Sequence, residues 1–140
     1  MSCVLVVDDS VEKLKGLERA AAAEGRVVLS ASARDEAERI LRERDIDLVV
    51  TDLALHSKSD TDGLDVLRKA AAMNIPVIVV SAYFTPANAR EAMKLGAFDL
   101  IDRGTDVWEP HAMLREKIAL ALRYGRALRQ ALQPVHAPAQ

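Results

Sequence analysis

The stretch Val4-Leu5-Val6-Val7-Asp8-Asp9-Ser10 decides the fold class of this sequence. Four apolar residues in succession, three of them β-branched, predict a strand that is buried on both faces. A helical spacing of apolar residues starts immediately afterwards, and Ser10 is a suitable N-cap for a helix over residues 11–24, with Gly25 just past its end. A buried strand that leads through a short turn into a helix is typical of a parallel sheet covered by helices.

The same alternation of a short β-branched run with a longer helical pattern recurs along the chain and gives five strand and helix pairs. The predicted strands cover residues 4–7, 26–31, 46–51, 75–80 and 98–101. The predicted helices cover residues 11–24, a segment opened by a capping box of Ser32 and Asp35, residues 64–73, residues 86–95, and a long segment from about residue 107. The sequence therefore predicts an α/β fold with a doubly wound, parallel, five-stranded sheet.

Composition limits the classes of function to be considered. A chain of 140 residues fits one domain, and 50 % apolar with 29 % charged residues is typical of a globular protein. The net charge of −2 is spread along the chain, so neither nucleic acid nor a membrane is expected as a partner. No apolar run approaches the roughly 20 residues of a membrane span, no signal peptide is recognisable, and Cys3 is the only cysteine. We expect a cytoplasmic protein without disulfide bonds.

The last predicted helix is longer than one face of a sheet requires. A row of mostly apolar residues recurs at alternating spacings of three and four over about 40 Å, at 1.5 Å per residue. Its members are Val107, His111, Leu114, Ile118, Ala121, Gly125, Leu128 and Leu132. We expect one domain over residues 1–124, followed by a helical extension and a frayed tail over residues 125–140. The second half of the helix is either solvated or a pairing surface, and pairing would give a homodimer.

Polar and charged side chains follow four of the predicted strands at the point where each strand ends. They are Asp8 with Asp9, Asp52, Ser81, and Asp102 with Arg103. The carboxyl ends of parallel strands meet at one edge of the sheet, where ligands bind in open α/β sheets. Carboxylates so close together repel one another unless a cation neutralises them, and Mg²⁺ prefers such oxygen ligands. The sequence thus predicts a Mg²⁺ site at which an Asp oxygen attacks a phosphoryl group while a Ser hydroxyl and an Arg guanidinium from neighbouring strands hold its oxygens.

Each of these residues also has a purely structural interpretation. The two acids after the first strand could start a helix, where carboxylates favour the positive end of the dipole. Asp52 could be a helix cap, Ser81 a turn residue, and Arg103 a partner of Asp102 or Asp99. A functional site is favoured because three carboxylates, a hydroxyl and a cation coincide at one edge.

The chain resembles the response-regulator receiver domains over roughly residues 4–122. The resemblance is carried by the opening stretch quoted above and by four further motifs. These are Asp47-Leu48-Val49-Val50-Thr51-Asp52-Leu53, Asp62-Gly63, Pro76-Val77-Ile78-Val79-Val80-Ser81-Ala82 and Gly96-Ala97-Phe98-Asp99. The resemblance implies a flavodoxin-like (βα)5 fold with strand order 2-1-3-4-5 and a role in a two-component signalling system.

The resemblance also implies roles for individual residues. Asp52 corresponds to the phosphoacceptor, Asp9 to a direct Mg²⁺ ligand, and Asp8 to a ligand that acts partly through water. The carbonyl of Ala54 is implied as a further ligand, and the hydroxyl of Ser81 as the group that follows the phosphoryl group.

A receiver of this kind is a signalling phosphoacceptor and not an enzyme that turns over outside substrates. Its implied donor is a sensor histidine kinase or a histidine phosphotransferase. Its implied target is a downstream protein that binds the face formed by the fourth helix, the fifth strand and the fifth helix. With no output domain expected in these 140 residues, the signal would pass through such a partner or through a dimer, unless the chain is the N-terminal piece of a longer protein.

Three departures from the family pattern keep a second interpretation open. Arg103 and Gly104 stand where the family has lysine and proline, and Leu100 stands where it has an aromatic switch residue. The loop after Asp52 is a few residues longer, with Leu55-His56 in place of a Met-Pro pair. These differences favour, as the alternative, a degenerate receiver that is an interaction module independent of phosphorylation. A haloacid-dehalogenase phosphohydrolase is disfavoured, because the opening stretch lacks the Asp-x-Asp-x-Thr spacing of that family.

Overall fold

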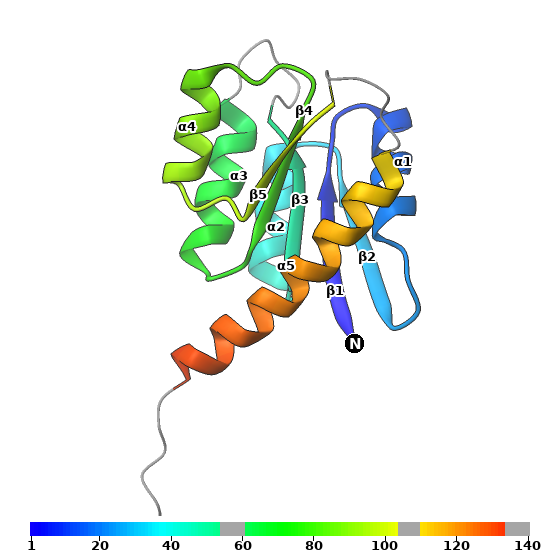
Figure 1. Ribbon diagram of the computed structural model, residues 1–140. Coiled ribbons are helices and arrows are strands. Elements are labelled where there is room, and N and C mark those ends of the chain that lie inside the picture. Colours follow the sequence, from blue (N-terminus) through cyan, green and yellow to red (C-terminus); the bar gives the residue numbers. More distant parts are fainter. Residues whose placement is uncertain (54–60, 104–109, 134–140) are drawn as a thin grey trace, which may run out of the picture.

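A computed structural model of the chain describes residues 1–53, 61–103 and 110–133. Strands and helices alternate through these residues, and the strands form one parallel sheet in the order β2-β1-β3-β4-β5 (Figure 1). The strands are β1 (Ser2–Val7), β2 (Arg26–Ala31), β3 (Leu48–Asp52), β4 (Val77–Ser81) and β5 (Asp99–Asp102). The helices are α1 (Val11–Ala21), α2 (Arg34–Glu43), α3 (Thr61–Ala72), α4 (Pro86–Lys94) and α5 (Pro110–Leu132). The predicted fold class and the strand order 2-1-3-4-5 are confirmed.

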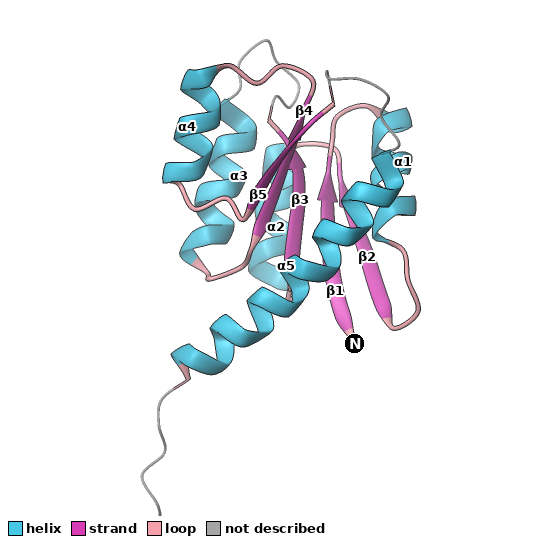
Figure 2. Cartoon of the chain, in the orientation of Figure 1, coloured by secondary structure: helices cyan, strands magenta, loops and turns pink. Residues whose placement is uncertain are grey.

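Helices cover both faces of the sheet, and each face has its own apolar core (Figure 2). α1 and α5 pack on one face, where Leu17, Leu114 and Ile118 are buried. α2, α3 and α4 pack on the other face, where Leu41 and Leu67 are buried. Side chains of a strand point alternately to the two faces, so the central strands must be apolar on both sides. This requirement explains the continuous apolar runs of the sequence.

The register of the sheet brings the carboxyl ends of the strands level with one another. Asp52 of β3 lies beside Val80 of β4, and Ser81 lies beside Asp102 of β5. β1 pairs with β3 on the other side, and it ends at Val7, one residue before Asp8. The polar residues that follow these strands therefore emerge at the same edge.

α1 is shorter than the sequence predicted. It ends at Ala21 and not at Glu24, because the chain turns back early to enter the sheet. The carbonyl of Gly25 already accepts the N–H of Ser2 in β1, at 3.1 Å. Gly25 permits this turn because its φ of +79° lies in the left-handed region.

α2 begins without the predicted capping box of Ser32 and Asp35, so that prediction is wrong. Its N-cap is Ala33, its first helical residue is Arg34, and no side chain caps the helix. A capping box needs its hydroxyl on the N-cap residue itself, and Ser32 lies one residue too early. Asp35 and Glu36 still stabilise the helix start through the positive end of the dipole.

α5 continues beyond the edge of the sheet at which the strands begin (Figure 1). Gly125 is buried there, and a Cβ at this position would lie 3.0 Å from Cγ of Pro76. Arg129 forms an ion pair with Asp47, with 2.9 Å between Nη1 and Oδ1. These contacts hold the helix against the sheet as far as Arg129, whereas residues 130–133 are exposed. The division of the chain after residue 124 stays a prediction, and α5 is continuous across it.

Candidate functional site

Three carboxylates meet at the carboxyl edge of the sheet. Asp8 and Asp9 follow β1, and Asp52 is the last residue of β3. One oxygen from each of these carboxylates lies within 4.8 Å of the other two. The turn after β1 is fixed by Ser10, whose side chain accepts the N–H of Lys13 and whose own N–H donates to Oδ1 of Asp8 at 3.0 Å. The structure thus brings together the three acids that the sequence placed at this edge.

Arg103 reaches across the sheet edge to Asp8. Its Nη1 lies 3.2 Å from Oδ2 of Asp8, whose side chain is fully buried, while the Arg103 side chain is only 12 % exposed. The backbone N–H of Arg103 donates to the carbonyl of Ser81 at 2.7 Å, which fixes where the side chain starts. Asp99, one of the partners considered for Arg103, instead pairs with Lys117 at 2.7 Å. Arg103 is therefore the charged partner of a buried site carboxylate.

Burial raises the pKa of the Asp52 carboxyl group, and the nearby charge of Asp8 raises it further. Three contacts act in the opposite direction. They are the N–H of Leu53, which donates to Oδ1 of Asp52 at 2.7 Å, and the positive charges of Arg103 and Lys13. Because the pKa is raised on balance, these contacts do not offset burial and repulsion completely. An additional cation at this edge would stabilise the ionised form of Asp52.

Two residues beside Asp52 were missed by the sequence analysis. Lys13 lies in the first turn of α1, and its charge lowers the pKa of Asp52. Its position three residues after Ser10, in the first turn of the predicted helix, was the signal that could have revealed it. Thr51 is fully buried, and its hydroxyl donates to the carbonyl of Asp52 at 2.9 Å. A hydroxyl inside an otherwise apolar strand was the corresponding signal for Thr51.

Ser81 is buried at the end of β4, 5 % exposed. Its Oγ accepts the N–H of Tyr83 at 3.1 Å, so its own hydroxyl proton is available for a further acceptor. Ala54, whose carbonyl the family resemblance implied as a metal ligand, lies outside the described residues. So does Trp108, the only tryptophan of the chain.

Gly63 allows the start of α3 to approach the end of β3. Its N–H donates to the carbonyl of Leu53 at 3.0 Å. A Cβ at this position would collide with the carbonyl oxygens of Asp52 and Leu53 and would lie 2.6 Å from the carbonyl carbon of Leu53. Glycine alone fits this approach, which ties the first turn of α3 to the residue after Asp52.

The donor set at this edge fits Mg²⁺. Three carboxylate oxygens within 4.8 Å of one another are hard ligands of the type that Mg²⁺ prefers. Burial, followed by the charge of Asp8, raises the pKa of Asp52, so a divalent cation would stabilise its ionised form. Arg103 already supplies one positive charge, directed at Asp8.

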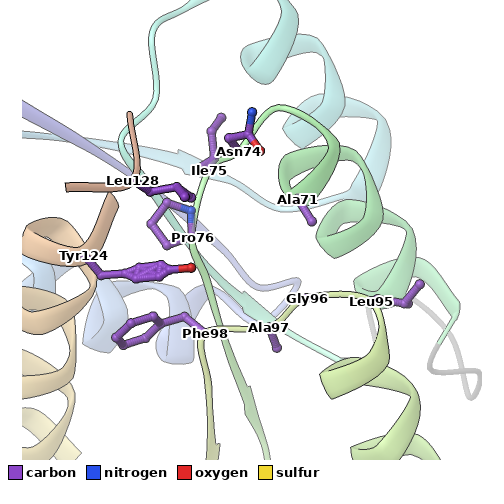
Figure 3. A pocket seen from close by; sticks show the side chains of 10 residues that line it. All are labelled: Ala71, Asn74, Ile75, Pro76, Leu95, Gly96, Ala97, Phe98, Tyr124 and Leu128. Carbon is purple, nitrogen blue, oxygen red and sulfur yellow. The ribbon is translucent and has the colours of Figure 1, made fainter. Parts of the chain in front are cut away.

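A separate cavity of about 560 Å³ lies at the opposite edge of the sheet, where the strands begin (Figure 3). Pro76 and Phe98 line it just before β4 and β5, and Tyr124 and Leu128 of α5 form one wall. The rings of Phe98 and Tyr124 meet edge to face, with 5.2 Å between their centroids. In open parallel sheets ligands bind at the carboxyl ends of the strands, so the acidic edge remains the candidate functional site.

Comparison with known proteins identifies the class of domain that this fold and site define. Residues 4–115 match the family described as the response regulator receiver domain, and the chain belongs to that family. Receiver domains are signalling domains of two-component systems that bind Mg²⁺ in an acidic pocket and interact with histidine kinases and downstream effectors. The resemblance inferred from the sequence motifs is confirmed.

Among curated relatives, the transcriptional regulatory protein ZraR of Escherichia coli O157:H7 is 34 % identical over 119 residues, which cover 83 % of this chain and 26 % of ZraR. The transcriptional regulatory protein KdpE of Mycobacterium tuberculosis H37Rv is 33 % identical over 135 residues, which cover 96 % of this chain and 57 % of KdpE. The chain therefore spans about a quarter to just over half of the length of these relatives.

Among solved structures, a response regulator receiver domain protein from Clostridium thermocellum superposes with a TM-score of 0.73 at 27 % identity, covering 95 % of this chain and all of that one. A CheY-like receiver domain protein from Methanospirillum hungatei gives a TM-score of 0.78 at 22 % identity, covering 91 % of this chain and 98 % of that one, and supports the fold. Within the described residues, no helix has the length and apolar character needed to cross a membrane.

Proposed function

We propose that this receiver accepts a phosphoryl group on Asp52 in a Mg²⁺-dependent reaction and that the added charge switches a surface formed by α4, β5 and α5. One observation carries the proposal: carboxylate oxygens of Asp8, Asp9 and Asp52 lie within 4.8 Å of one another at the carboxyl edge of the sheet. In this proposal Asp8 and Asp9 hold the metal together with Asp52, and the carbonyl of Ala54 adds a ligand.

In the proposed reaction, an oxygen of the Asp52 carboxylate forms a bond to phosphorus. The bond between phosphorus and the donor's leaving group breaks, and its electron pair remains with the leaving group. The donor is the phosphohistidine of a sensor kinase or of a histidine phosphotransferase. When bound, Mg²⁺ supplies positive charge that offsets the charge of the incoming phosphoryl group. The N–H of Leu53 holds Oδ1 of Asp52 and so orients the acceptor carboxylate.

Ser81 and Arg103 are proposed to hold the transferred group. The hydroxyl of Ser81, which accepts from Tyr83, keeps its proton for a phosphoryl oxygen. A guanidinium has five N–H donors, so Arg103 can bond a phosphoryl oxygen while it keeps its bond to Asp8. The charge on Asp52 would then be transmitted to β5 through Arg103, whose backbone also bonds Ser81.

The proposed output surface runs from this edge along α4, β5 and α5 toward the edge at which the strands begin. On it, Lys117 of α5 pairs with Asp99 of β5, while Met93 of α4 and Tyr124 of α5 are about half exposed. We propose that a downstream protein binds here and that the last helix, through the extension over residues 125–140, allows a homodimer. We further propose that the protein acts in the cytoplasm and that its partners are proteins, with neither nucleic acid nor a membrane among them.

The test is incubation with acetyl phosphate and Mg²⁺, followed by intact-mass analysis. We expect a gain of one phosphoryl group in the parent and none in Asp52→Asn, with peptide mapping to Asp52. Beryllofluoride with Mg²⁺ should also change the fluorescence of Trp108. Failure of the parent to gain mass under conditions that phosphorylate a control receiver would contradict the proposal.

The ion pair between Arg103 and Asp8 favours one alternative, a degenerate receiver that binds its partner without phosphorylation. In that case Arg103 permanently supplies part of the positive charge at Asp8 that Mg²⁺ would otherwise supply. Asp52→Asn would then retain full partner binding, whereas the phosphorylated receiver requires Asp52. Phosphorylation of Arg103→Lys beside the parent separates the two functions further, because a rate much higher in Arg103→Lys would assign a degenerate role to the parent.

A further inference from the structure

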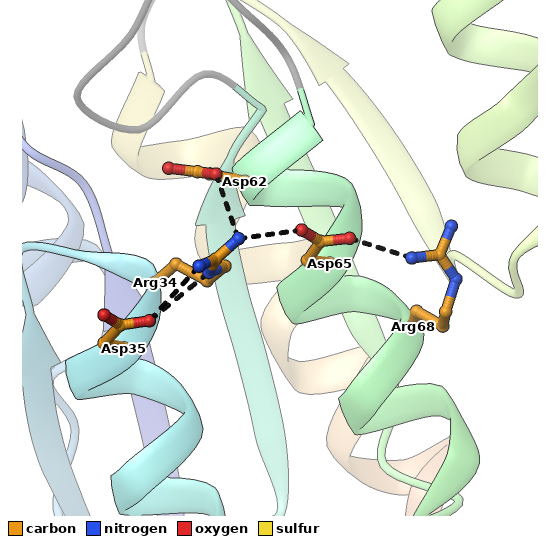
Figure 4. Close-up of polar contacts among 5 residues, drawn as sticks. All are labelled: Arg34, Asp35, Asp62, Asp65 and Arg68. Carbon is orange, nitrogen blue, oxygen red and sulfur yellow. Dashed lines mark hydrogen bonds and ion pairs between the residues drawn. The ribbon is translucent and has the colours of Figure 1, made fainter.

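An ion-pair network crosses from α2 to the first turn of α3, close to the end of β3 (Figure 4). Its members, called the Arg34 network below, are Arg34, Asp35, Asp62, Asp65 and Arg68. Nη1 of Arg34 lies 3.1 Å from Oδ2 of Asp65 and 3.5 Å from Oδ1 of Asp62. The other oxygen of Asp65 accepts from Arg68 at 2.8 Å. One cation of α2 thus holds two carboxylates of α3.

The contacts of Arg34 with Asp62 and Asp65 on α3 are less exposed to solvent than its contact with Asp35 on α2. The side chains of Asp62 and Asp65 are 28 % and 29 % exposed, and Arg34 is 39 % exposed. Asp35, the neighbour that Arg34 also contacts at 3.4 Å, is 87 % exposed. Screening by water and salt weakens exposed pairs most, so the bonds of Arg34 to α3 contribute more than its bond within α2.

The residue that follows Asp62 connects the Arg34 network to the acceptor. Gly63 packs against the carbonyl oxygens of Asp52 and Leu53, and its N–H donates to the carbonyl of Leu53 at 3.0 Å. The N–H of Leu53 in turn donates to Oδ1 of Asp52 at 2.7 Å. Leu53 therefore links α3 to the acceptor: its carbonyl accepts a hydrogen bond from α3, and its N–H donates one to the carboxylate of Asp52.

We propose that Arg34 is a positioning residue for phosphoryl transfer. By holding Asp62 and Asp65 it keeps the first turn of α3 against Leu53, and Leu53 keeps the Asp52 carboxylate in the orientation that receives the phosphoryl group. The inference rests on the proposed function of Asp52, and it adds α2 to β3 and α3 as the elements that set the geometry of the acceptor.

Hydrogen exchange of backbone amides in metal-free protein tests the structural half of the inference. The test variant is Arg34→Met, which keeps much of the side-chain length and removes the charge. Arg39→Met is the matched control, because Arg39 is exposed on the same helix and forms no ion pair with any described residue. We expect exchange at Gly63 and Leu53 to rise about three- to fivefold in Arg34→Met, the change that a partly exposed ion-pair network can transmit. The control should match the parent.

The kinetic half is tested with acetyl phosphate and Mg²⁺. A positioning role predicts that Arg34→Met lowers the maximal phosphorylation rate about three- to fivefold while the half-saturating donor concentration changes little. Arg34→Lys should restore part of the rate, since it restores the charge but not the planar guanidinium. Asp65→Asn should reproduce the loss, and adding it to Arg34→Met should cost little more, because the two changes remove the same contact.

The outcomes separate this inference from a general loss of stability. A rise in exchange spread evenly over all helices, or exchange at Gly63 and Leu53 equal to that of Arg39→Met, would overturn it. An unchanged maximal rate in both Arg34→Met and Asp65→Asn would overturn it as well. If the parent itself takes up no phosphoryl group, the proposed function of Asp52 fails, and the exchange data on metal-free protein still decide whether Arg34 orders Leu53.

Discussion

Replacing Gly63 by alanine should be among the most damaging single-methyl additions in this domain. The added Cβ would meet the carbonyl oxygens of Asp52 and Leu53 and would lie 2.6 Å from the carbonyl carbon of Leu53. Real Cβ contacts are essentially never shorter than 3.0 Å, so the two backbones must separate by at least 0.4 Å at that carbon and by more at the oxygens. Overpacking of this kind costs about 1–3 kcal/mol, and the strained hydrogen bond from Gly63 to Leu53 adds about 1 kcal/mol.

We therefore expect Gly63→Ala to lose about 2–4 kcal/mol of unfolding free energy in urea titrations followed by circular dichroism. The matched control is Gly25→Ala, where no atom lies within 4 Å of the added Cβ and the cost comes from the φ of +79°, about 1–2 kcal/mol. Gly63→Ala should also slow phosphorylation of Asp52, because it displaces Leu53. A loss equal to or smaller than that of Gly25→Ala, with an unchanged phosphorylation rate, would refute the close approach of α3 to β3.

Three further perturbations test the charges of the structure. Burial, followed by the charge of Asp8, raises the pKa of Asp52, so the protonated form of Asp52 favours folding at low pH and this contribution is lost as the pH rises through the folded-state pKa. Asp52→Asn should consequently be more stable than the parent at neutral pH in metal-free buffer and lose that advantage in acid, as melting temperatures across the pH range will show. Arg103→Met leaves the fully buried Asp8 without its cation and should cost about 3 kcal/mol in urea titrations, whereas a cost below about 1 kcal/mol would mean that the pair is not formed in solution. Arg129→Met breaks the partly exposed pair with Asp47 and should cost at most about 1 kcal/mol, with an effect that disappears at high salt.

The sheet and the gathering of acids at its edge were predictable from the sequence for a simple reason. A strand that is buried on both faces must be apolar throughout, so the first charged residue after the run marks its end. Asp8 and Asp52 each follow such a run directly, and parallel pairing brings these ends together without any knowledge of side-chain conformation. The apolar runs therefore predict where the strands end, and the strand ends predict where the carboxylates lie.

The partners of the long cationic side chains were not predictable in the same way. Arg103 was expected to face a phosphoryl group or to pair with Asp102 or Asp99, and the structure places it 3.2 Å from Asp8, 95 residues away in the chain. A guanidinium on a long flexible stem can reach several carboxylates at a crowded edge, and only the packing around it selects one of them. Arg34 was missed for a related reason, because its partners lie on α3, and a single helical pattern does not reveal which neighbouring helix faces it.

The charges around Asp52 bear on Arg103, which stands where the family resemblance predicts a lysine. Burial raises the pKa of Asp52, the charge of Asp8 raises it further, and the positive charges of Arg103 and Lys13 act in the opposite direction. One of those cations is committed to the buried Asp8. A longer, planar side chain that stays paired with Asp8 neutralises that carboxylate, whereas a compact ammonium group would leave more of its charge for a metal to balance. In the proposed function Arg103 and a divalent cation therefore share Asp8, and we expect the balance between them to set how far this receiver depends on phosphorylation.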